Sequence, residues 1–172
     1  MKPGDMDTHY QKTEASDIWA TPQAIVDSLG RFDLDACALP TNAKCERFYT
    51  PEENSLTKNW GGRVWCNPPY SQPLLYQFCT KMAEHGNGIL LIFARTGNKV
   101  WQEIIFPKAD AVLFLRKRIK FLLPDGTPGG SAGCDSALIA FGKENVDALW
   151  SCGLDGSIVT LEKRAITIPT LF

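Results

Sequence analysis

The sequence predicts an α/β fold, in which a mostly parallel sheet has helices on both faces and antiparallel strands toward its C-terminal end. Three observations support this prediction. Apolar runs typical of strands alternate with stretches of helical spacing. Residues 89–94 are continuously apolar between glycine-containing turns, which suits a strand covered on both faces. After residue 107 strand-like segments predominate, which favours antiparallel pairing there.

The N-terminal part begins with a polar stretch. Residues 1–17 show no periodicity and are predicted to be a flexible arm, whereas 18–172 are predicted to form a single domain. Thr21-Pro22 predicts a helix start, with Thr21 as N-cap and Pro22 in the first helical position. Gly30 would end this helix.

The remaining elements follow from the spacing of apolar residues. Helices are predicted over residues 73–85, about 98–106 and 143–151, with a Pro/Gly loop at 124–133. Strands are predicted at residues 32–36, 44–50, 63–66, 89–94, 111–115, 120–123, 136–141 and 157–161.

Composition excludes several classes of protein. With 18 Lys and Arg against 19 Asp and Glu, the net charge is -1, so any nucleic-acid contact must come from a local basic patch. No apolar run approaches the ~20 residues of a membrane span, and residues 1–17 lack a signal-peptide core. A cytoplasmic protein without membrane contact is therefore expected.

The cysteines and histidines argue against a metal site. Six cysteines occur without any C-x-x-C spacing, and His9 and His85 are the only histidines. A structural zinc site needs closely spaced pairs of such ligands, so no metal is expected and the thiols are expected to be reduced. Cys37 and Cys66 are interpreted as packing residues, and Trp65 and Trp101 as core residues.

The segment Asn67-Pro68-Pro69-Tyr70 directly follows the predicted strand at 63–66. The two prolines fix φ and remove two backbone donors, and Asn67 is kept extended because a proline follows it. The segment therefore presents an amide oxygen, bare carbonyls and one aromatic ring at the edge of a sheet where α/β proteins bind ligands.

Two neighbouring acceptors suit a partner with two donor hydrogens, such as an amine. A flat base that carries the amine would stack on Tyr70. The other interpretation of these residues is an ordinary strand-end turn.

The segment resembles the catalytic tetrapeptide of S-adenosylmethionine-dependent amino-methyltransferases, which act on adenine N6 or cytosine N4. Over about 18–142 the chain resembles the small bacteriophage-type DNA N6-adenine methyltransferases, which implies a Rossmann-like methyltransferase sheet. The ordered motifs are Trp19-Ala20-Thr21-Pro22, Leu34-Asp35-Ala36, Asn54-Ser55-Leu56 with Trp60, Val64 to Ser71, Ala94-Arg95-Thr96 with Trp101, and Arg118-Ile119-Lys120-Phe121.

The resemblance implies a set of cofactor-binding residues for S-adenosylmethionine. Asn54 stands where the family commonly has an acidic residue, and the loop after Asp35 lacks the usual glycine-rich turn. Both departures leave the cofactor affinity open. The implied residues are Trp19, Thr21, Pro22, Asp35, Ala36, Asn54 and Ser55.

The resemblance also implies a mechanism, with Asn67, Pro68, Pro69 and Tyr70 as catalytic residues. The target adenine is flipped out of double-stranded DNA, Asn67 and the Pro68 carbonyl hold its N6 amine, and Tyr70 stacks on the ring. The amine attacks the methyl carbon in line, without a metal or a covalent intermediate.

Substrate contacts are expected from other residues. In a strand, Arg116, Arg118 and Lys120 would share one face and contact phosphates, unless this face is simply solvated. The resemblance implies that Phe121 helps to cover the flipped base, which requires a bend. Ser71, Arg95 and Thr96 follow strands at the same edge, and the other interpretation of Arg95 is a structural salt bridge.

One further motif match is rejected, and alternatives to adenine methylation stay open. The string Gly129-Gly130-Ser131-Ala132-Gly133 matches the hydrolase G-x-S-x-G pattern, but it lacks the strand–helix context and a later histidine, so it is interpreted as a flexible loop. The alternatives to adenine methylation are cytosine N4, RNA or a protein amide as acceptor, or a catalytically silent DNA-binding relative. The oligomeric state and the target sequence cannot be derived.

Overall fold

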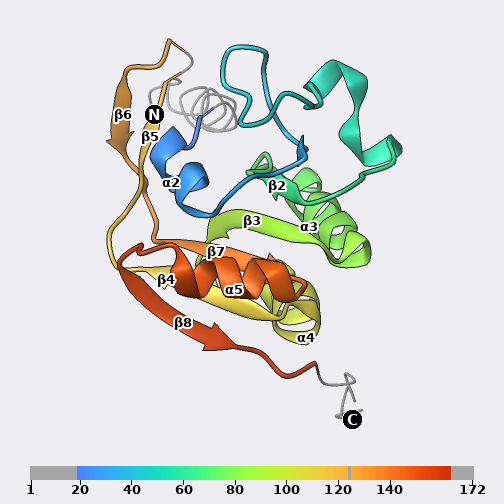
Figure 1. Ribbon diagram of the computed structural model, residues 1–172, viewed down its shortest axis with the longest axis vertical. Helices are drawn as coiled ribbons and strands as arrows, with labels where there is room; N and C mark the ends of the chain where they lie inside the picture. Colours follow the sequence, from blue (N-terminus) through green and yellow to red (C-terminus); the bar gives the residue numbers. More distant parts are fainter. Residues whose placement is uncertain (1–18, 124, 164–172) are drawn as a thin grey trace, which may run out of the picture.

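The computed structural model describes residues 19–123 and 125–163, so the predicted arm at 1–17 lies outside the described residues. A six-stranded sheet has the order β1-β2-β3-β7-β4-β8 (Figure 1). Its strands are β1 (Leu34–Asp35), β2 (Val64–Cys66), β3 (Gly88–Phe93), β4 (Ala111–Leu115), β7 (Ser136–Phe141) and β8 (Gly156–Thr160). The α/β prediction is confirmed.

The helices also follow the predicted spacing. They are α2 (Gln23–Ser28), α3 (Leu74–His85), the π-helical segment η3 (Trp101–Ile105) continuing into α4 (Phe106–Lys108), and α5 (Lys143–Ser151). Two short 3-10 turns, η1 (Pro51–Glu53) and η2 (Ser55–Thr57), lie between β1 and β2.

The sheet is mixed, which confirms only part of the predicted topology. β1, β2 and β3 are parallel neighbours, whereas β3–β7, β7–β4 and β4–β8 are antiparallel pairs. β1 to β4 all run in one direction because β7 is antiparallel to both β3 and β4. The sheet has the predicted antiparallel C-terminal strands, but parallel pairing is limited to β1–β2–β3.

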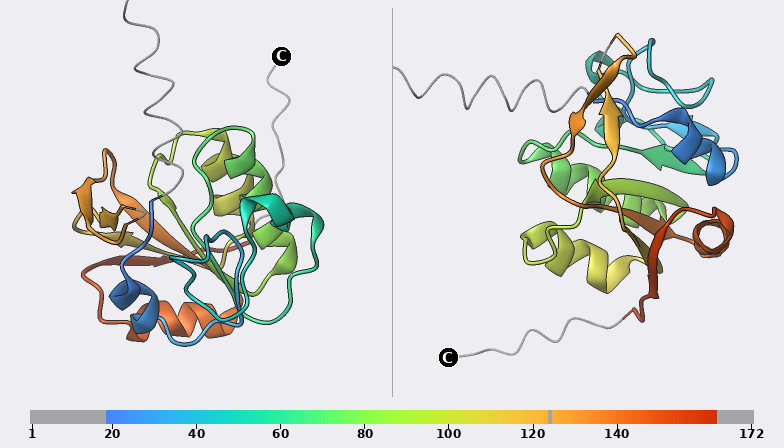
Figure 2. Two further views of the ribbon diagram at one scale, coloured as in Figure 1. Left: turned by 90° about the horizontal axis from the view of Figure 1, so that it is seen from above. Right: turned by 90° about the vertical axis from the view of Figure 1, so that its left-hand side faces the viewer.

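Helices cover both faces of the sheet, as predicted (Figure 2). Leu90 and Ile92 of β3 pack with α3 and η3, whereas Ile89 and Leu91 pack with residues of α2 and α5. This alternation is the period of two expected of a strand. Trp65 and Trp101 are buried in these two cores, in agreement with their interpretation as core residues.

The segment expected to be a loop at 124–133 contains a strand instead. β5 (Lys120–Leu122) and β6 (Pro128–Ser131) form a two-stranded antiparallel hairpin beside the main sheet (Figure 1). The glycine-rich sequence of β6 hid it, because glycine has low strand propensity. The hairpin is tied to the rest of the molecule by a bridge between Leu122 and Ala20.

Three other local predictions are wrong. Residues 44–50 form no strand; only Phe48 bridges to Asp35. Pro22 is the N-cap of α2, and Thr21 makes no capping hydrogen bond. The stripe of Arg116, Arg118 and Lys120 assumed a strand over residues 116–119, but β4 ends at Leu115 and the chain bends before β5.

Candidate active site

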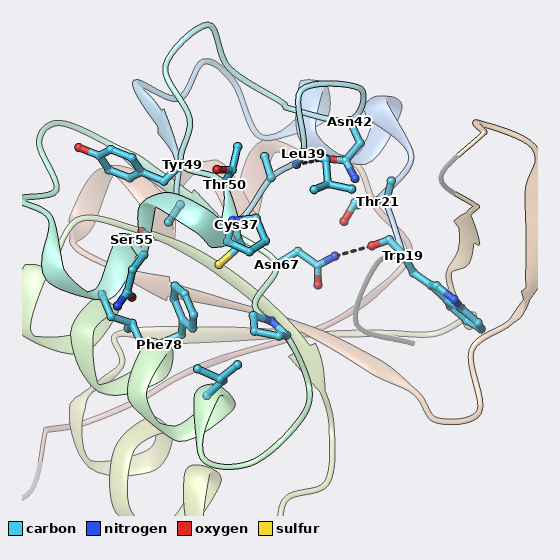
Figure 3. Close-up of a pocket in the computed structure, with 18 residues that line it drawn as sticks. Trp19, Thr21, Cys37, Leu39, Asn42, Tyr49, Thr50, Ser55, Asn67 and Phe78 are labelled. Atoms are coloured by element: carbon cyan, nitrogen blue, oxygen red, sulfur yellow. Dashed lines mark hydrogen bonds between the residues drawn. The ribbon is translucent and has the colours of Figure 1, made fainter. Parts of the chain in front are cut away.

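A cavity of about 290 Å³ lies at the carboxyl ends of β1 and β2 (Figure 3). Its volume is near the lower end of the ~300–1,000 Å³ range of small-molecule sites. The lining is largely apolar, with a few polar side chains. It is formed by Trp19, Ala20, Thr21, Ala36, Cys37, Ala38, Leu39, Asn42, Tyr49, Thr50, Pro51, Asn54, Ser55, Leu56, Asn67, Pro69, Leu74 and Phe78.

The structure brings many of the predicted residues together around this cavity. Those that line it are Trp19, Thr21, Ala36, Asn54, Ser55, Asn67 and Pro69, whereas Pro22, Asp35, Pro68 and Tyr70 are not among the lining residues. The sequence did not single out Leu39 and Asn42. They lie in the loop that follows β1, a place where α/β sheets bind ligands, and this position is the signal that could have identified them.

Thr21 provides an unpartnered polar group at this cavity. Its side chain is 1% exposed, and Oγ1 has no hydrogen-bond partner among the described residues. A buried hydroxyl without a partner carries a desolvation cost, so Thr21 Oγ1 would gain a hydrogen bond from a polar atom of a bound molecule. An apolar cavity with this hydroxyl fits a cofactor that has both apolar and polar parts, such as S-adenosylmethionine.

Asp35 does not line the cavity, and its carboxyl group has hydrogen-bond partners within the chain. Its carboxylate accepts hydrogen bonds from the backbone N–H groups of Cys37 (3.2 Å) and Lys44 (3.0 Å). Asp35 therefore joins the two ends of the loop whose middle part lines the cavity. Burial raises the pKa of this carboxyl from 3.8 to about 7, and the two backbone hydrogen bonds oppose the rise.

Asn54 and Ser55 contribute in different ways. Asn54 has φ 50° and ψ 76°, a left-handed conformation that asparagine tolerates better than most residues, and it links η1 to η2. Ser55 is 3% exposed, and the indole N–H of Trp60 donates to both its carbonyl (3.1 Å) and its Oγ (2.9 Å). Ser55 thus fixes Trp60 next to the cavity.

The Asn67 amide is held from both ends. Its Nδ2 donates to the Trp19 carbonyl at 3.1 Å (Figure 3), and its Oδ1 lies 3.3 Å from the Tyr70 hydroxyl. That hydroxyl is also 3.3 Å from the Leu91 carbonyl. The Tyr70 ring stacks on Phe93 with a centroid distance of 4.3 Å, and burial raises its pKa.

The predicted substrate residues do not form one cluster. Arg118 pairs with Asp135 at 3.2 Å, while Arg116 pairs with Asp155 at 3.0 Å. The expected single stripe of Arg116, Arg118 and Lys120 is therefore wrong, because the segment is not a continuous strand. Lys120 is exposed on β5.

Phe121 is 1% exposed and packs against the Trp19 ring, so it belongs to the core in this conformation.

The other substrate candidates lie on loops after β2 and β3. Arg95 and Thr96 are exposed, and the Arg95 guanidinium lies 5.6 Å from the Phe93 ring centroid. Among the described residues Arg95 is in no ion pair, contrary to the salt-bridge interpretation. The Ser71 carbonyl accepts from the Leu75 N–H at the start of α3.

None of the six cysteines forms a disulfide. All six cysteines are free, and Cys37 Sγ lies 3.6 Å from Cys66 Sγ. Burial raises the pKa of both thiols, which favours the neutral form. Within residues 19–123 and 125–163, no group of His, Cys, Asp and Glu has the arrangement of a metal site. No helix in this part of the chain has the length and apolar character to cross a membrane.

The fold and the site together define an open-sheet α/β protein with a small-molecule site at the carboxyl ends of its parallel strands. Comparison with protein families makes this specific. The model of the family described as DNA N-6-adenine-methyltransferase (Dam) matches residues 8–164, so the chain belongs to that family. The resemblance noted in the sequence is confirmed.

Individual relatives agree with this assignment. The chain is 32% identical over 120 residues to the DNA N-6-adenine-methyltransferase of Haemophilus phage HP1 (strain HP1c1), a match that covers 64% of this chain and 69% of that protein. It is 36% identical over 109 residues to the protein of the same name from Escherichia phage T1, covering 55% and 46%. It is also 36% identical over 72 residues to the putative methyltransferase YfdM of Escherichia coli (strain K12), covering 36% and 79%.

Proposed function

We propose that the chain binds S-adenosylmethionine in the cavity and holds a flipped-out adenine of double-stranded DNA at Asn67–Tyr70 for methylation at N6. DNA N6-adenine methylation is the activity of the family to which the chain belongs. The observation that supports the proposal most directly is the place of Asn67, which lines the cavity and also contacts Tyr70. One side chain thus borders both the cofactor site and the base site.

On the cofactor side, the residues bind and orient. S-adenosylmethionine supplies a methyl group on a sulfonium when it is bound. Thr21 Oγ1 offers a buried hydrogen bond to its polar end, and Ala36 and the loop after it form an apolar wall. Asn54 takes the place of the family's common acidic residue and offers an amide oxygen to an adenine amine.

On the base side, Asn67 Oδ1 and the Pro68 carbonyl accept the two hydrogens of the N6 amine. This makes the nitrogen more pyramidal and its lone pair more available for in-line attack. The Tyr70 ring, backed by Phe93, supports the base by stacking. The Tyr70 hydroxyl releases Asn67 Oδ1 to the incoming amine, because Leu91 offers it a second acceptor at the same distance.

DNA phosphates are bound by exposed basic residues that follow β3 or lie in and before β5. Arg95 follows β3, Arg118 precedes β5 and Lys120 lies within β5. Since the net charge of the chain is -1, these local cations supply the electrostatic attraction. Ser71 and Thr96 would add polar contacts from the loops beside them.

The test is transfer of labelled methyl from S-adenosylmethionine to unmethylated duplex DNA, followed by analysis of the nucleosides. The wild type is expected to form N6-methyladenine, and Asn67→Ala to lose at least about 100-fold in kcat. Asn59→Ala is the matched control, because Asn59 is exposed and outside the cavity lining. N4-methylcytosine, or label only in RNA or protein, would show a different acceptor. Absence of both transfer and cofactor binding would identify a silent relative.

A further inference from the structure

We propose that Trp19 is a positioning residue for Asn67 and that the β5–β6 hairpin, through Trp19, sets the orientation of the Asn67 amide. The inference rests on the proposed function, in which Asn67 Oδ1 accepts from the target amine. It assigns to the hairpin a role in catalysis that is separate from contact with DNA.

The first step is the orientation of the amide. A backbone carbonyl only accepts hydrogen bonds, so the Trp19 carbonyl selects the amide rotamer in which Nδ2 faces it, at 3.1 Å. Oδ1 is then directed to the opposite side, where it meets the Tyr70 hydroxyl. If the amide were turned by 180°, Asn67 Oδ1 would face the Trp19 carbonyl oxygen. The substrate amine would then meet Nδ2, which is a donor. The Trp19 carbonyl therefore fixes which atom of Asn67 meets the substrate.

The second step is how Trp19 is held. The next residue, Ala20, exchanges two backbone hydrogen bonds with Leu122 of β5, at 3.0 and 2.9 Å. The Trp19 indole points away from Asn67 (Figure 3) and packs against Phe121 of the same strand, with ring centroids 6.0 Å apart. The Trp19 carbonyl thus accepts from the Asn67 amide, while the Trp19 side chain packs against the hairpin.

The third step is what the hairpin carries. Lys120 is exposed on β5, and Arg118 lies just before it. Both are residues expected to contact phosphates. If bound DNA displaces β5, the backbone hydrogen bonds between Leu122 and Ala20 move Ala20 with it. The contact between Phe121 and Trp19 moves the Trp19 ring. The catalytic amide is therefore held in place by the element that faces DNA.

The test compares Phe121→Leu with Phe141→Leu. Both phenylalanines are 1% exposed, so the two variants lose the same group from equally buried positions. Phe141 lies at the far end of β7, opposite Gly88, away from Trp19. We expect kcat to fall about five- to tenfold in Phe121→Leu, the equivalent of one weakened hydrogen bond, while KM for S-adenosylmethionine stays within about twofold. Phe141→Leu is expected to keep the wild-type kcat.

A second measurement reports on the amide directly and needs no activity. The side-chain NH2 protons of Asn67 are identified by NMR from their loss in Asn67→Asp. In the wild type and in Phe141→Leu, one of them is expected to exchange slowly with water, because it is bonded to the Trp19 carbonyl. In Phe121→Leu it is expected to exchange several times faster.

The outcomes separate this inference from the proposed function. Equal kcat values for the two leucine variants, or unchanged Asn67 exchange in Phe121→Leu, would overturn the positioning role. A raised KM for DNA with unchanged exchange would also overturn it, because Phe121 would then act by covering the base. A wild type that transfers no methyl group to DNA refutes the proposed function, while the exchange measurement still decides whether Trp19 holds Asn67.

Discussion

Tyr70 combines two features that substitutions can separate: a ring stacked on Phe93 and a hydroxyl shared between Asn67 Oδ1 and the Leu91 carbonyl. In the proposed function the ring supports the base, whereas the hydroxyl only occupies Asn67 until the amine arrives. Tyr70→Phe is therefore expected to keep kcat/KM within about threefold of the wild type. Tyr70→Ala is expected to lose roughly 10- to 100-fold, in line with ~1–3 kcal/mol of base stacking.

Steady-state methylation of duplex DNA by the two variants is the measurement. Equal losses in both would mean that the hydroxyl, and not the ring, matters for the reaction.

Asp35 makes stability depend on pH in an unusual direction for a carboxyl group. Its pKa is raised from 3.8 to about 7 by burial, so between these values the folded state holds a proton that the unfolded state releases. The free energy of unfolding therefore falls as pH rises from about 4 to 7, by at most about 1.4 kcal/mol per pH unit. Asp35→Asn does not titrate and is expected to lack this component.

Urea unfolding of the wild type and Asp35→Asn between pH 5 and 8 tests the sign. The free energy of unfolding of the wild type, minus that of the variant, should fall as pH rises. Parallel curves would show that Asp35 is ionised throughout in the folded protein.

At the scale of elements, the loop before β5 carries Arg118 in an ion pair with Asp135 at 3.2 Å. The two side chains are 52% and 67% exposed, so the pair contributes only about 0–1 kcal/mol to stability. Arg118→Ala is expected to leave the fold intact, weaken DNA binding, and reduce the slope of log K against log salt by about 1.

Binding titrations at several salt concentrations give that slope. Lys143→Ala is the control, since Lys143 also forms an exposed ion pair, with Asp147 on α5. A slope equal to that of the wild type would exclude Arg118 from contact with phosphates.

The elements also show which helices and strands can be predicted from the spacing of apolar residues. The helix at 74–85 and the strand at 88–93 agree closely with their predicted bounds, because their apolar spacing reflects burial against one or both sides. The hairpin strand β6 escapes prediction, because Pro128-Gly129-Gly130-Ser131 has no apolar alternation and pairs only through its backbone with β5. Thr21 has the local pattern of a helix cap because Pro22 follows it, but tertiary packing buries its hydroxyl at the cavity.

The candidate site was predictable where it depends on a local motif, and not where it depends on contacts between distant residues. Asn67 and its neighbours stand out locally, because two consecutive prolines directly after a strand make a rigid rim with free acceptors. The contact between Asn67 and Trp19 joins residues far apart in the chain, and no local pattern reports it. For the same reason the sequence did not show that the Asp35 carboxylate accepts hydrogen bonds from the backbone of the loop after β1.

At the scale of the whole molecule, Arg63 connects distant parts of the chain. Its buried guanidinium donates to the carbonyls of Leu29 and Arg31 in the segment after α2, and to Oδ1 of Asn145 in α5 at 2.7 Å. Arg63→Ala would leave these acceptors unsatisfied and is expected to lower the free energy of unfolding by about 3 kcal/mol. Arg31→Ala, a change at an exposed neighbour, is expected to stay within about 0.5 kcal/mol.

Chemical denaturation of both variants tests this. A loss below about 1 kcal/mol for Arg63→Ala would show that water replaces the guanidinium in this network.

The position of β7 has a consequence for synthesis on the ribosome. β7 lies between β3 and β4 although it follows both in the chain. Until residues 136–141 have emerged, β3 and β4 have no partner between them, and their apolar edges stay open to other chains. Since chains grow at ~5–20 residues/s, the nascent protein spends seconds in this state before β7 can close the sheet.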